Sequence, residues 1–412
     1  MIRTLIAFTL FAAGALALAA EAASPAGLLP DSLAQTLLQQ DPAVAAARTG
    51  LQLAGQDASL LDRSPYEPVL RAASQQRRAS DAGRQAEWEL GVEQTLRLPA
   101  KADADRRIGH AGNTLAQAQY GEVLHESARQ LLTLWLDWQA AGQAEALAAR
   151  NTEAAAGAFA AVDKRYRAGD ASRLELNLAR SEELEQQRLE NEARSAAAAA
   201  WIRLSQRYPG VPQQSASLAP PPIGEQPASF WLRRIVEQSD RLKVADARLQ
   251  LVQAQLQRAG AERYPDPTLG VFHASEAGGR DRISGISISV PFAPGLRAAR
   301  NRRAETEVAI ARQQLEQQQR LLESEVASAV RAAEGSLVSL TLARQSAAAM
   351  QANADQAQRA YSLGEIDLQS LLQARRLAIQ AASNALSAQL AAWKAGYGLM
   401  VDAHLVWGLA HD

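Results

Sequence analysis

Cysteine is absent from the 412-residue sequence, and aromatic residues make up only 5% of it. The lack of cysteine excludes disulfides, thiolate metal sites and a lipid-modified N-terminal cysteine. The formal net charge is −1, which excludes the strong basic excess of a nucleic-acid-binding protein. Hydrophobic residues reach 47%, much of this fraction being alanine. This composition favours long, closely packed helices over one thick globular core.

Long apolar runs are also lacking, except at the N-terminus. There Arg3 precedes an apolar stretch from Leu5 to about Ala20, with small-x-small cleavage sites at 17–19 and 20–22. This pattern predicts a secretory signal peptide over residues 1–22. A retained anchor helix is the alternative, but the run is short for a membrane span and no basic stop follows it. Any other membrane-spanning part of the chain must then be built from β-strands.

One turn motif occurs twice in the sequence, at an offset of 195 residues. Its defining residues are Tyr166, Gly169 and Asp170 in the first copy and Tyr361, Gly364 and Glu365 in the second. A glycine can adopt a positive φ and end a helix, and the polar residues after it suit the start of the next helix. Each copy lies between long tracts without proline. The motif therefore predicts the tips of two helical hairpins.

Further matches follow the same order along the two halves of the chain. The matching segments are 44–54 with 244–254, Leu96-x-Leu98-Pro99 with Ile288-x-Val290-Pro291, and 101–107 with 297–303. Such self-similarity predicts an internal duplication. The chain after the signal then divides into a first repeat at 23–207, a proline-rich linker at 208–227 and a second repeat at 228–412.

Each repeat is predicted to hold the same four elements. The first repeat has a helix at 31–62, a β-hairpin at 67–98, a long helix at 100–167 and a return helix at 171–207. The second has a helix at 228–261, a β-hairpin at 268–291, a long helix at 295–362 and a return helix at 366–403. Asp31 and Ser229 are the expected N-caps of the two first helices. At 1.5 Å per residue each long helix extends roughly 100 Å, and the first and return helices of a repeat would match it if stacked end to end.

The hairpin of the first repeat alternates with a period of two. Its apolar positions are Trp88, Leu90, Val92, Leu96 and Leu98, and its polar positions include Glu87, Glu89, Glu93 and Arg97. The alternation predicts strands with one apolar and one polar face. Four strands cannot span a bilayer alone, but three chains would give an even-numbered barrel of twelve. The apolar face would then meet lipid, and Glu89, Glu93 and Arg97 would face a wet lumen.

Six basic residues fall where strands give way to helices: Lys101, Arg106, Arg107, Arg297, Arg302 and Arg303. We interpret them as a basic collar at the membrane-water boundary that faces anionic lipid head groups. The alternative, that they are solvated charges at the start of a helix, is equally open.

The duplicated halves, the strand pair in each half and the two Tyr-x-x-Gly tips resemble the outer membrane efflux proteins, the TolC-like outer membrane factor family. The resemblance covers nearly the whole chain after the signal. It implies a mainly α fold with a small transmembrane β part. Duplicated long helical hairpins would form a trimeric α-barrel, joined to a 12-stranded β-barrel with four strands per chain. It also implies a location in the outer membrane of a Gram-negative bacterium, extending into the periplasm.

By this resemblance the chain is the outer-membrane channel of a tripartite efflux system, a homotrimer that acts as a passive export duct. The tips would lie at the periplasmic mouth and dock a periplasmic adaptor (membrane fusion protein), which couples to an inner-membrane pump of the RND type. The stretch from Gln94 to Lys101 is similar to the heavy-metal, CzcC-like branch, in which glycine is common at the position of Ala100. Heavy-metal cations are therefore one candidate cargo, and drugs and organic solvents stay open as alternatives, because all of them would use the same duct.

Some relatives carry an acidic ring just past the second tip. This chain has the neutral Ser370 and Gln373 there, whereas Glu175 follows the first tip. Glu175 is thus the candidate for a charged ring at the mouth, and a solvated helix glutamate is the alternative.

No residue pattern indicates catalysis, a cofactor or a metal centre. The five histidines are scattered, no nucleophile elbow or Gly-rich phosphate loop occurs, and His273 is expected on a surface loop. The alternative function is a secreted periplasmic coiled-coil scaffold or adaptor without a pore. It would explain the helices equally well, but not the alternation between Trp88 and Leu98.

Overall fold

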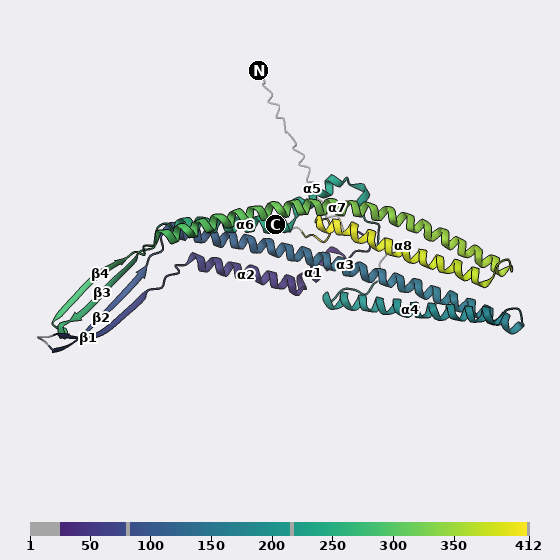
Figure 1. Ribbon diagram of the computed structural model, residues 1–412, viewed down its shortest axis with the longest axis horizontal. Helices are drawn as coiled ribbons and strands as arrows, with labels where there is room; N and C mark the ends of the chain where they lie inside the picture. Colours follow the sequence, from purple (N-terminus) through teal and green to yellow (C-terminus); the bar gives the residue numbers. More distant parts are fainter. Residues whose placement is uncertain (1–24, 80–82, 215–217, 410–412) are drawn as a thin grey trace, which may run out of the picture.

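The computed structural model describes residues 25–79, 83–214 and 218–409. Within this range the chain is a long rod, with a sheet at one end and two helical tips at the other (Figure 1). The predicted signal peptide lies outside the described residues, as do residues 80–82 of the expected turn of the first hairpin.

Both repeats have the same order of helices and strands. The first contains α1 (Asp31–Gln40), α2 (Pro42–Asp62), β1 (Val69–Ala79), β2 (Gly83–Thr95), α3 (Pro99–Ala168) and α4 (Arg173–Arg207). The linker carries a short 3-10 helix, η1 (Ile223–Glu225). The second repeat contains α5 (Ala228–Gln238), α6 (Asp240–Ala261), β3 (Thr268–Glu276), η2 (Ala277–Gly279), β4 (Asp281–Ser289), α7 (Pro294–Ser362) and α8 (Leu368–Asp402). The predicted mainly helical fold with four strands per chain is confirmed. None of the described helices is both long and apolar enough to cross a membrane.

The first helix of each repeat is broken into two, which the sequence analysis did not predict. The breaks occur at Asp41 and Ser239, whose side chains cap the helices that follow. Asp41 Oδ1 accepts a hydrogen bond from the Ala43 N–H (2.8 Å), and Ser239 Oγ accepts one from the Leu242 N–H (3.3 Å). Both are N-cap residues in the middle of the predicted helices, and each satisfies a backbone donor that a new helix start leaves free.

The expected N-caps at Asp31 and Ser229 are wrong. Pro30 and Pro227 occupy those positions, so that Asp31 is the first residue of α1 and Ser229 lies inside α5. The Asp31 carboxylate is used elsewhere, because its Oδ1 accepts a hydrogen bond from the Trp407 N–H (3.1 Å). A contact with a residue near the opposite end of the chain thus replaces the local cap.

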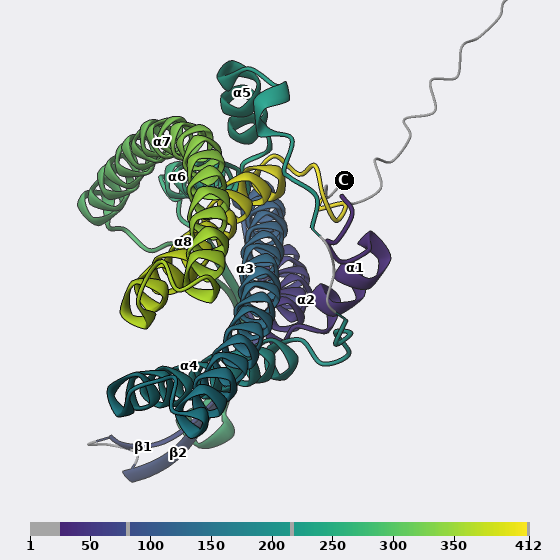
Figure 2. The ribbon, with the colours of Figure 1, turned by 90° about the vertical axis from the view of Figure 1, so that its right-hand side faces the viewer.

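The long helices are covered by the shorter ones in succession. α2 and α4 pack along successive parts of α3, and α6 and α8 pack along α7 (Figure 1). Small residues allow close packing: a Cβ added to Gly109 in α3 would lie 3.0 Å from Ala58 in α2. Viewed along the rod, α3–α4 and α7–α8 form two separate hairpins (Figure 2).

The largest hydrophobic core lies in the middle of the rod, where the linker meets residues from both ends of the described chain. Trp407 and Tyr397 have no exposed side-chain surface there. The Tyr397 hydroxyl donates to the carbonyl of Ala219 in the linker (2.6 Å), and Trp407 Nε1 donates to the Leu29 carbonyl (3.0 Å). Large aromatic side chains with satisfied polar atoms stabilise such a core. The middle is therefore the part of the rod with the densest aromatic packing.

The four strands form one antiparallel sheet in the order β1-β2-β3-β4, so that β2 and β3 join the two repeats. The register places Leu70 opposite Val92, Val92 opposite Val271, and Val271 opposite Ile286. Residues directly opposite one another share a face of the sheet. This face is apolar and exposed in the single chain. Its exposed large hydrophobic residues are Leu70, Trp88, Leu90, Val92, Leu269, Val271, Ile286 and Ile288.

The other face of the sheet carries paired polar side chains. Arg71 forms an ion pair with Glu93 across β1 and β2 (2.9 Å), and Gln75 donates to Glu87 (2.8 Å). The division into an apolar and a polar face agrees with the alternation in the sequence.

Candidate functional site at the two ends of the rod

The first tip is a Schellman turn centred on Gly169. Gly169 has a φ of 84°, in the left-handed region. Its N–H donates to the Tyr166 carbonyl (3.0 Å), and the Asp170 N–H donates to the Arg165 carbonyl (2.8 Å). These two bonds are the Schellman pattern, which satisfies carbonyls that the end of a helix leaves free.

The second tip repeats this turn with Gly364, whose φ is 78°. The Gly364 N–H donates to the Tyr361 carbonyl (3.0 Å), and the Glu365 N–H donates to the Ala360 carbonyl (2.9 Å). The two tips therefore have the same backbone hydrogen bonds, although only the tyrosine, the glycine and an acidic residue are common to both.

The helices that leave the tips are capped by side chains. Ser172 caps α4 in a capping box, in which its Oγ accepts from the Glu175 N–H (3.2 Å) and Glu175 Oε2 accepts from the Ser172 N–H (2.8 Å). Asp367 caps α8 by accepting from the Ser370 N–H (2.8 Å). This hydrogen bonding lowers the pKa of the Asp367 carboxyl. The Glu175 carboxylate thus stabilises the start of a helix in the single chain, a function that the sequence analysis did not assign to it.

Arg165 connects the two tips. Its Nη1 donates to the Tyr361 hydroxyl (2.8 Å), and its guanidinium carbon lies 5.3 Å from the centre of the Tyr361 ring. Nη2 donates to the Asp170 carbonyl of its own turn (3.1 Å). Burial raises the pKa of the Tyr361 phenol, so the hydroxyl stays protonated and accepts the bond. Sequence analysis missed Arg165, because 195 residues further on the equivalent position is Ala360 and the contact has no repeat.

Behind this contact the two hairpins share a small core and an ion pair. The buried residues of the core are Val162, Ala179, Leu368, Leu371 and Leu372, with Tyr361 packed against them. Two turns further along, Arg376 of α8 donates twice to Glu182 Oε2 of α4 (2.9 and 2.6 Å). The Glu182 side chain is only 7% exposed, so this pair is screened less than a surface pair. The tips of the two repeats are thus joined to each other by side chains.

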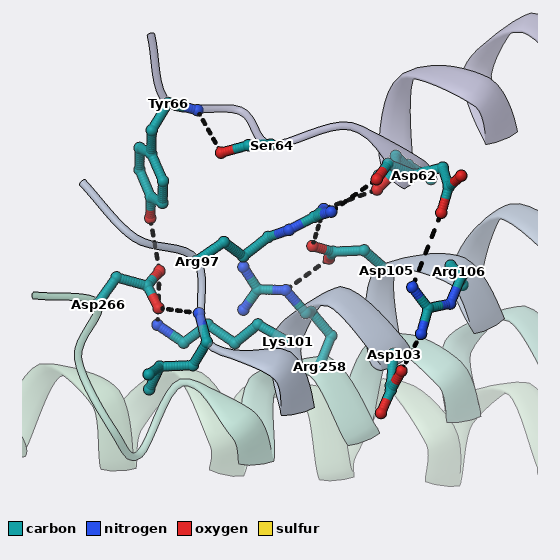
Figure 3. Close-up of polar contacts among 12 residues, drawn as sticks. Asp62, Ser64, Tyr66, Arg97, Lys101, Asp103, Asp105, Arg106, Arg258 and Asp266 are labelled. Carbon is teal, nitrogen blue, oxygen red and sulfur yellow. Dashed lines mark hydrogen bonds and ion pairs between the residues drawn. The ribbon is translucent and has the colours of Figure 1, made fainter. Parts of the chain in front are cut away.

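At the opposite end, Asp266 joins the sheet to the helices (Figure 3). Its Oδ2 accepts from the Tyr66 hydroxyl (2.7 Å) and pairs with Lys101 Nζ (3.0 Å), and its Oδ1 accepts from the Leu98 N–H (3.0 Å). Burial acts to raise the pKa of the Asp266 carboxyl, but these three donors outweigh it and lower the pKa. Burial and the neighbouring carboxylate raise the pKa of the Tyr66 phenol to about 12. A single carboxylate of the second repeat therefore binds the Tyr66 hydroxyl, the Lys101 ammonium and the Leu98 N–H of the first repeat.

Asp105 makes a second connection between the repeats beside Asp266 (Figure 3). One oxygen accepts from Arg97 Nη1 (3.0 Å) and the other from Arg258 Nε in α6 (2.6 Å). Arg97 also donates to the carbonyls of Leu61 and Asp62 at the end of α2 (2.7 Å each). The predicted position of Arg97 in a wet lumen is wrong, because β2 ends at Thr95 and the Arg97 side chain, 9% exposed, satisfies the free carbonyls of a helix end.

A scan of protein families matches residues 231–400 to the outer membrane efflux protein model. This segment belongs to the outer membrane efflux protein family. A search of the curated proteins returned no match.

Solved structures match over nearly the whole chain. The outer-membrane channel OprN shares 18% identity at a TM-score of 0.74, with 92% of this chain and 90% of that chain covered. CmeC, an outer membrane channel of Campylobacter jejuni, shares 16% identity at a TM-score of 0.73, with 93% and 87% covered. VceC, an outer membrane protein of Vibrio cholerae, shares 15% identity at a TM-score of 0.71, with 92% and 95% covered.

The fold of outer membrane efflux proteins therefore extends over both repeats, although the family model matches the second. The resemblance inferred from the two tips and the strand pairs is confirmed. The family is one of channels rather than enzymes.

The predicted basic collar requires one correction. Lys101 is 3% exposed and pairs with Asp266, so it cannot face lipid head groups. Arg106 is exposed and pairs with Asp103, and Arg107 donates to Gln257 in α6 (2.8 Å). In the second repeat Arg297 donates to the Pro291 carbonyl (2.8 Å), Arg303 pairs with Glu307 (2.9 Å), and Arg302 is exposed. The five arginines stay candidates for the collar, and Lys101 belongs to the junction.

His273 lies within β3 and not on a loop as predicted. Its ring is 5.7 Å from Trp88, and Nδ1 makes a hydrogen bond with Ser284 Oγ (2.8 Å). Within the described part of the chain, no group of three or more His, Cys, Asp or Glu side chains converges on a metal position.

Proposed function

We propose that this chain is the outer-membrane channel of a tripartite efflux system and acts as a passive export duct. Three copies would assemble into a homotrimer in the outer membrane of a Gram-negative bacterium, with the helical rods extending into the periplasm. The observation that carries the proposal is the sheet, which exposes one apolar face and leaves one side each of β1 and β4 without a strand partner in the described chain.

An isolated sheet of this kind would leave backbone groups unpaired in lipid. Pairing β1 of one copy with β4 of the next satisfies both edges, and three copies of four strands form a closed barrel of twelve. The apolar face then contacts lipid, and the polar face with Arg71, Glu93 and Glu87 lines the lumen. A duct of this kind needs a continuous lumen and a mouth that opens, and no reacting groups.

The tips with Tyr166, Gly169, Asp170, Tyr361, Gly364 and Glu365 are proposed to form the periplasmic mouth. A periplasmic adaptor would dock there and couple the duct to an inner-membrane pump of the RND type. The Arg165–Tyr361 contact supports this reading, because an exposed hydrogen bond between two tips can break without unfolding the hairpins. Glu175 is retained as the candidate for an acidic ring, and heavy-metal cations as the candidate cargo.

The alternative is a periplasmic scaffold or adaptor without a pore. The exposed fraction of Ile286 is 80% and that of Ile288 is 68%, on the same face of β4. A protein that stays in water would not expose a sheet face of this size, and the channel is therefore favoured.

Conductance across planar bilayers tests the proposal, and the lack of native cysteine makes a labelling experiment clean. Leu363→Cys, at a tip position 74% exposed, should accept a bulky thiol reagent that lowers conductance. Val338→Cys, 61% exposed in the second half of α7 and away from the tip, is the matched control and should conduct as before. Purified protein that stays monomeric and soluble without detergent, with no conductance, would refute the duct.

A further inference from the structure

Two histidines and two aspartates meet in the middle of the rod, away from both candidate sites. His404 follows the end of α8, and its Nε2 lies 3.4 Å from Asp240 Oδ2 at the start of α6. His125 of α3 places its Nε2 3.5 Å from Asp402 Oδ1, in the last turn of α8. The centres of the two imidazole rings are 5.3 Å apart. The cluster therefore connects the first repeat to the C-terminal end of the second.

Several polar atoms of this cluster are buried and have charged neighbours, but make no hydrogen bond of good geometry. The side chains of His404 and Asp240 are each 2% exposed. In the described part of the chain, the following buried atoms make no hydrogen bond: Glu122 Oε2, His125 Nε2, Asp240 Oδ2, Asp402 Oδ1, and both ring nitrogens of His404. Glu122, His125, Asp240 and Asp402 line a cavity of about 140 Å³. Buried polar groups are normally hydrogen-bonded, so a change of charge at one of these imidazoles would change how the carboxylates beside it are bonded.

The charges around the cavity do not balance while both imidazoles are neutral. The carboxylates are Glu122 and Glu126 on α3, Asp240 on α6, Glu325 on α7 and Asp402 on α8. The basic side chains are Arg129 on α3, Arg234 on α5, and Arg241 and Lys243 on α6. Arg129 pairs with Asp402 (3.1 Å) and Lys243 with Asp240 (3.0 Å). Five carboxylates against four basic groups leave one surplus negative charge, which one proton on the histidine pair would neutralise.

We propose that His125 and His404, with Asp240 and Asp402, form a proton-operated latch that fastens the C-terminal segment to α3 and α6 as the pH falls. Histidine is the side chain that ordinarily changes charge between about pH 5 and pH 8. Uptake of one proton turns a near contact between an imidazole and a carboxylate into an ion pair with a hydrogen bond. A second proton is opposed by repulsion between the rings. Because no triad of metal ligands converges among the described residues, a proton fits the cluster better than a metal ion.

The latch acts on the segment that closes the core. Residues 405–409 follow His404, and Trp407 in this segment contacts both Leu29 and Asp31 through hydrogen bonds. Arg234 fixes the preceding carbonyl of Ala403 (3.2 Å). The latch should therefore be tightest in acid and loosen as the pH rises.

The full chain, purified in detergent, tests the latch by thermal unfolding between pH 8 and pH 6. His404→Asn and His125→Gln remove the titrating groups and keep hydrogen-bonding capacity, and asparagine tolerates the φ of 53° at position 404. His110→Gln, exposed on the same α3, is the matched control. On acidification from pH 8 to pH 6, the unfolding temperature of the wild type and of the control should rise by roughly 2–4 °C more than that of the two variants. Hydrogen exchange of residues 405–409 should slow in parallel.

Three results decide the proposal. The same pH response in wild type and in both histidine variants would overturn it. The proposal would also be overturned, in favour of a metal site, if Zn²⁺ stabilised the wild type at pH 8 and a chelator abolished both this stabilisation and the pH response. If a variant fails to fold, hydrogen exchange of residues 405–409 in the wild type is measured across the same pH range. Exchange that does not slow as the pH falls would contradict the latch, and exchange that slows would support it.

Discussion

Arg165 in the last turn of α3 donates a hydrogen bond of 2.8 Å to the hydroxyl of Tyr361, a residue at the tip of the other repeat. The contact is one-sided. Tyr166, the equivalent of Tyr361, is 39% exposed, and the equivalent of Arg165 is Ala360. The two tips therefore share a backbone but differ in the side chains that join them.

Tyr361→Phe should loosen the tips without disturbing the turns. The change removes the acceptor for Arg165 and keeps the ring in the small core. An exposed hydrogen bond of this kind contributes about 0.5–1 kcal/mol, so we expect a roughly two- to fivefold higher open probability in bilayer recordings. Tyr166→Phe is the matched control and should conduct like the wild type. Equal behaviour of the two variants would show that the Arg165 contact does not restrain the mouth.

Replacing Gly169 or Gly364 with valine should strain the tips through the backbone alone. No atom lies within 4 Å of a Cβ built at either glycine, so steric crowding is not the reason. The left-handed conformation costs a non-glycine residue roughly 1–2 kcal/mol, and more if it is β-branched. Export should fall more than trimer assembly, and limited proteolysis should cut at the tips.

Asparagine provides the control for these glycine variants. Gly169→Asn and Gly364→Asn should retain most export, because asparagine tolerates a positive φ. If the valine variants export as well as the asparagine variants, the left-handed turn is not needed for function.

Asp266→Asn should be severe, because it removes one partner of a buried ion pair. The loss leaves Lys101 charged and buried and should cost about 3–5 kcal/mol in the free energy of unfolding. The double variant with Lys101→Met should lose less than the two single variants added together. Denaturant unfolding of the four proteins forms the cycle, and strict additivity would mean that the pair is not coupled.

The same carboxylate predicts a pH dependence. The pKa of Asp266 is lowered from its ordinary value of 3.8, so the folded state binds its proton more weakly than the unfolded state. Its contribution to stability is therefore present above about pH 4 and is lost as the pH falls through the lowered pKa. Acid unfolding followed by circular dichroism should be shallower below pH 4 for Asp266→Asn than for the wild type. If the stability of both proteins falls equally steeply below pH 4, protonation of Asp266 does not contribute to the acid unfolding.

Features that depend on spacing along the chain were predictable from the sequence. The offset of 195 residues between Gly169 and Gly364 identified both tips, and the period of two around Trp88 and Leu90 identified the faces of the sheet. In both cases the signal lies in residues close together in the chain, and the duplication supplies an independent second copy.

Features that depend on distant partners were not predictable. In the sequence, Lys101 cannot be distinguished from the other basic residues at the start of a helix. Its partner Asp266 lies 165 positions away and comes close only in the folded chain. Asp31 was misassigned for the same reason, since its partner is Trp407. The breaks at Asp41 and Ser239 did carry a local signal, because each residue is a good N-cap, at an offset of 198.

Opposite faces of one strand provide the sharpest test of the proposal that the sheet inserts into a membrane. Leu90 and Glu89 are adjacent in β2. Leu90 is 50% exposed and lies on the apolar face of the sheet, whereas Glu89 lies on the polar face. Leu90→Arg should block insertion, because a basic side chain on a lipid face costs about 2–4 kcal/mol at mid-depth, and each trimer would carry three. Glu89→Arg should insert normally and alter only ion selectivity, because a lumen-facing charge remains in water. The measurement is the yield of heat-modifiable trimer in the outer-membrane fraction, followed by bilayer recording. Normal insertion of Leu90→Arg together with failure of Glu89→Arg would place lipid on the polar face, and the assignment of the two faces would be reversed.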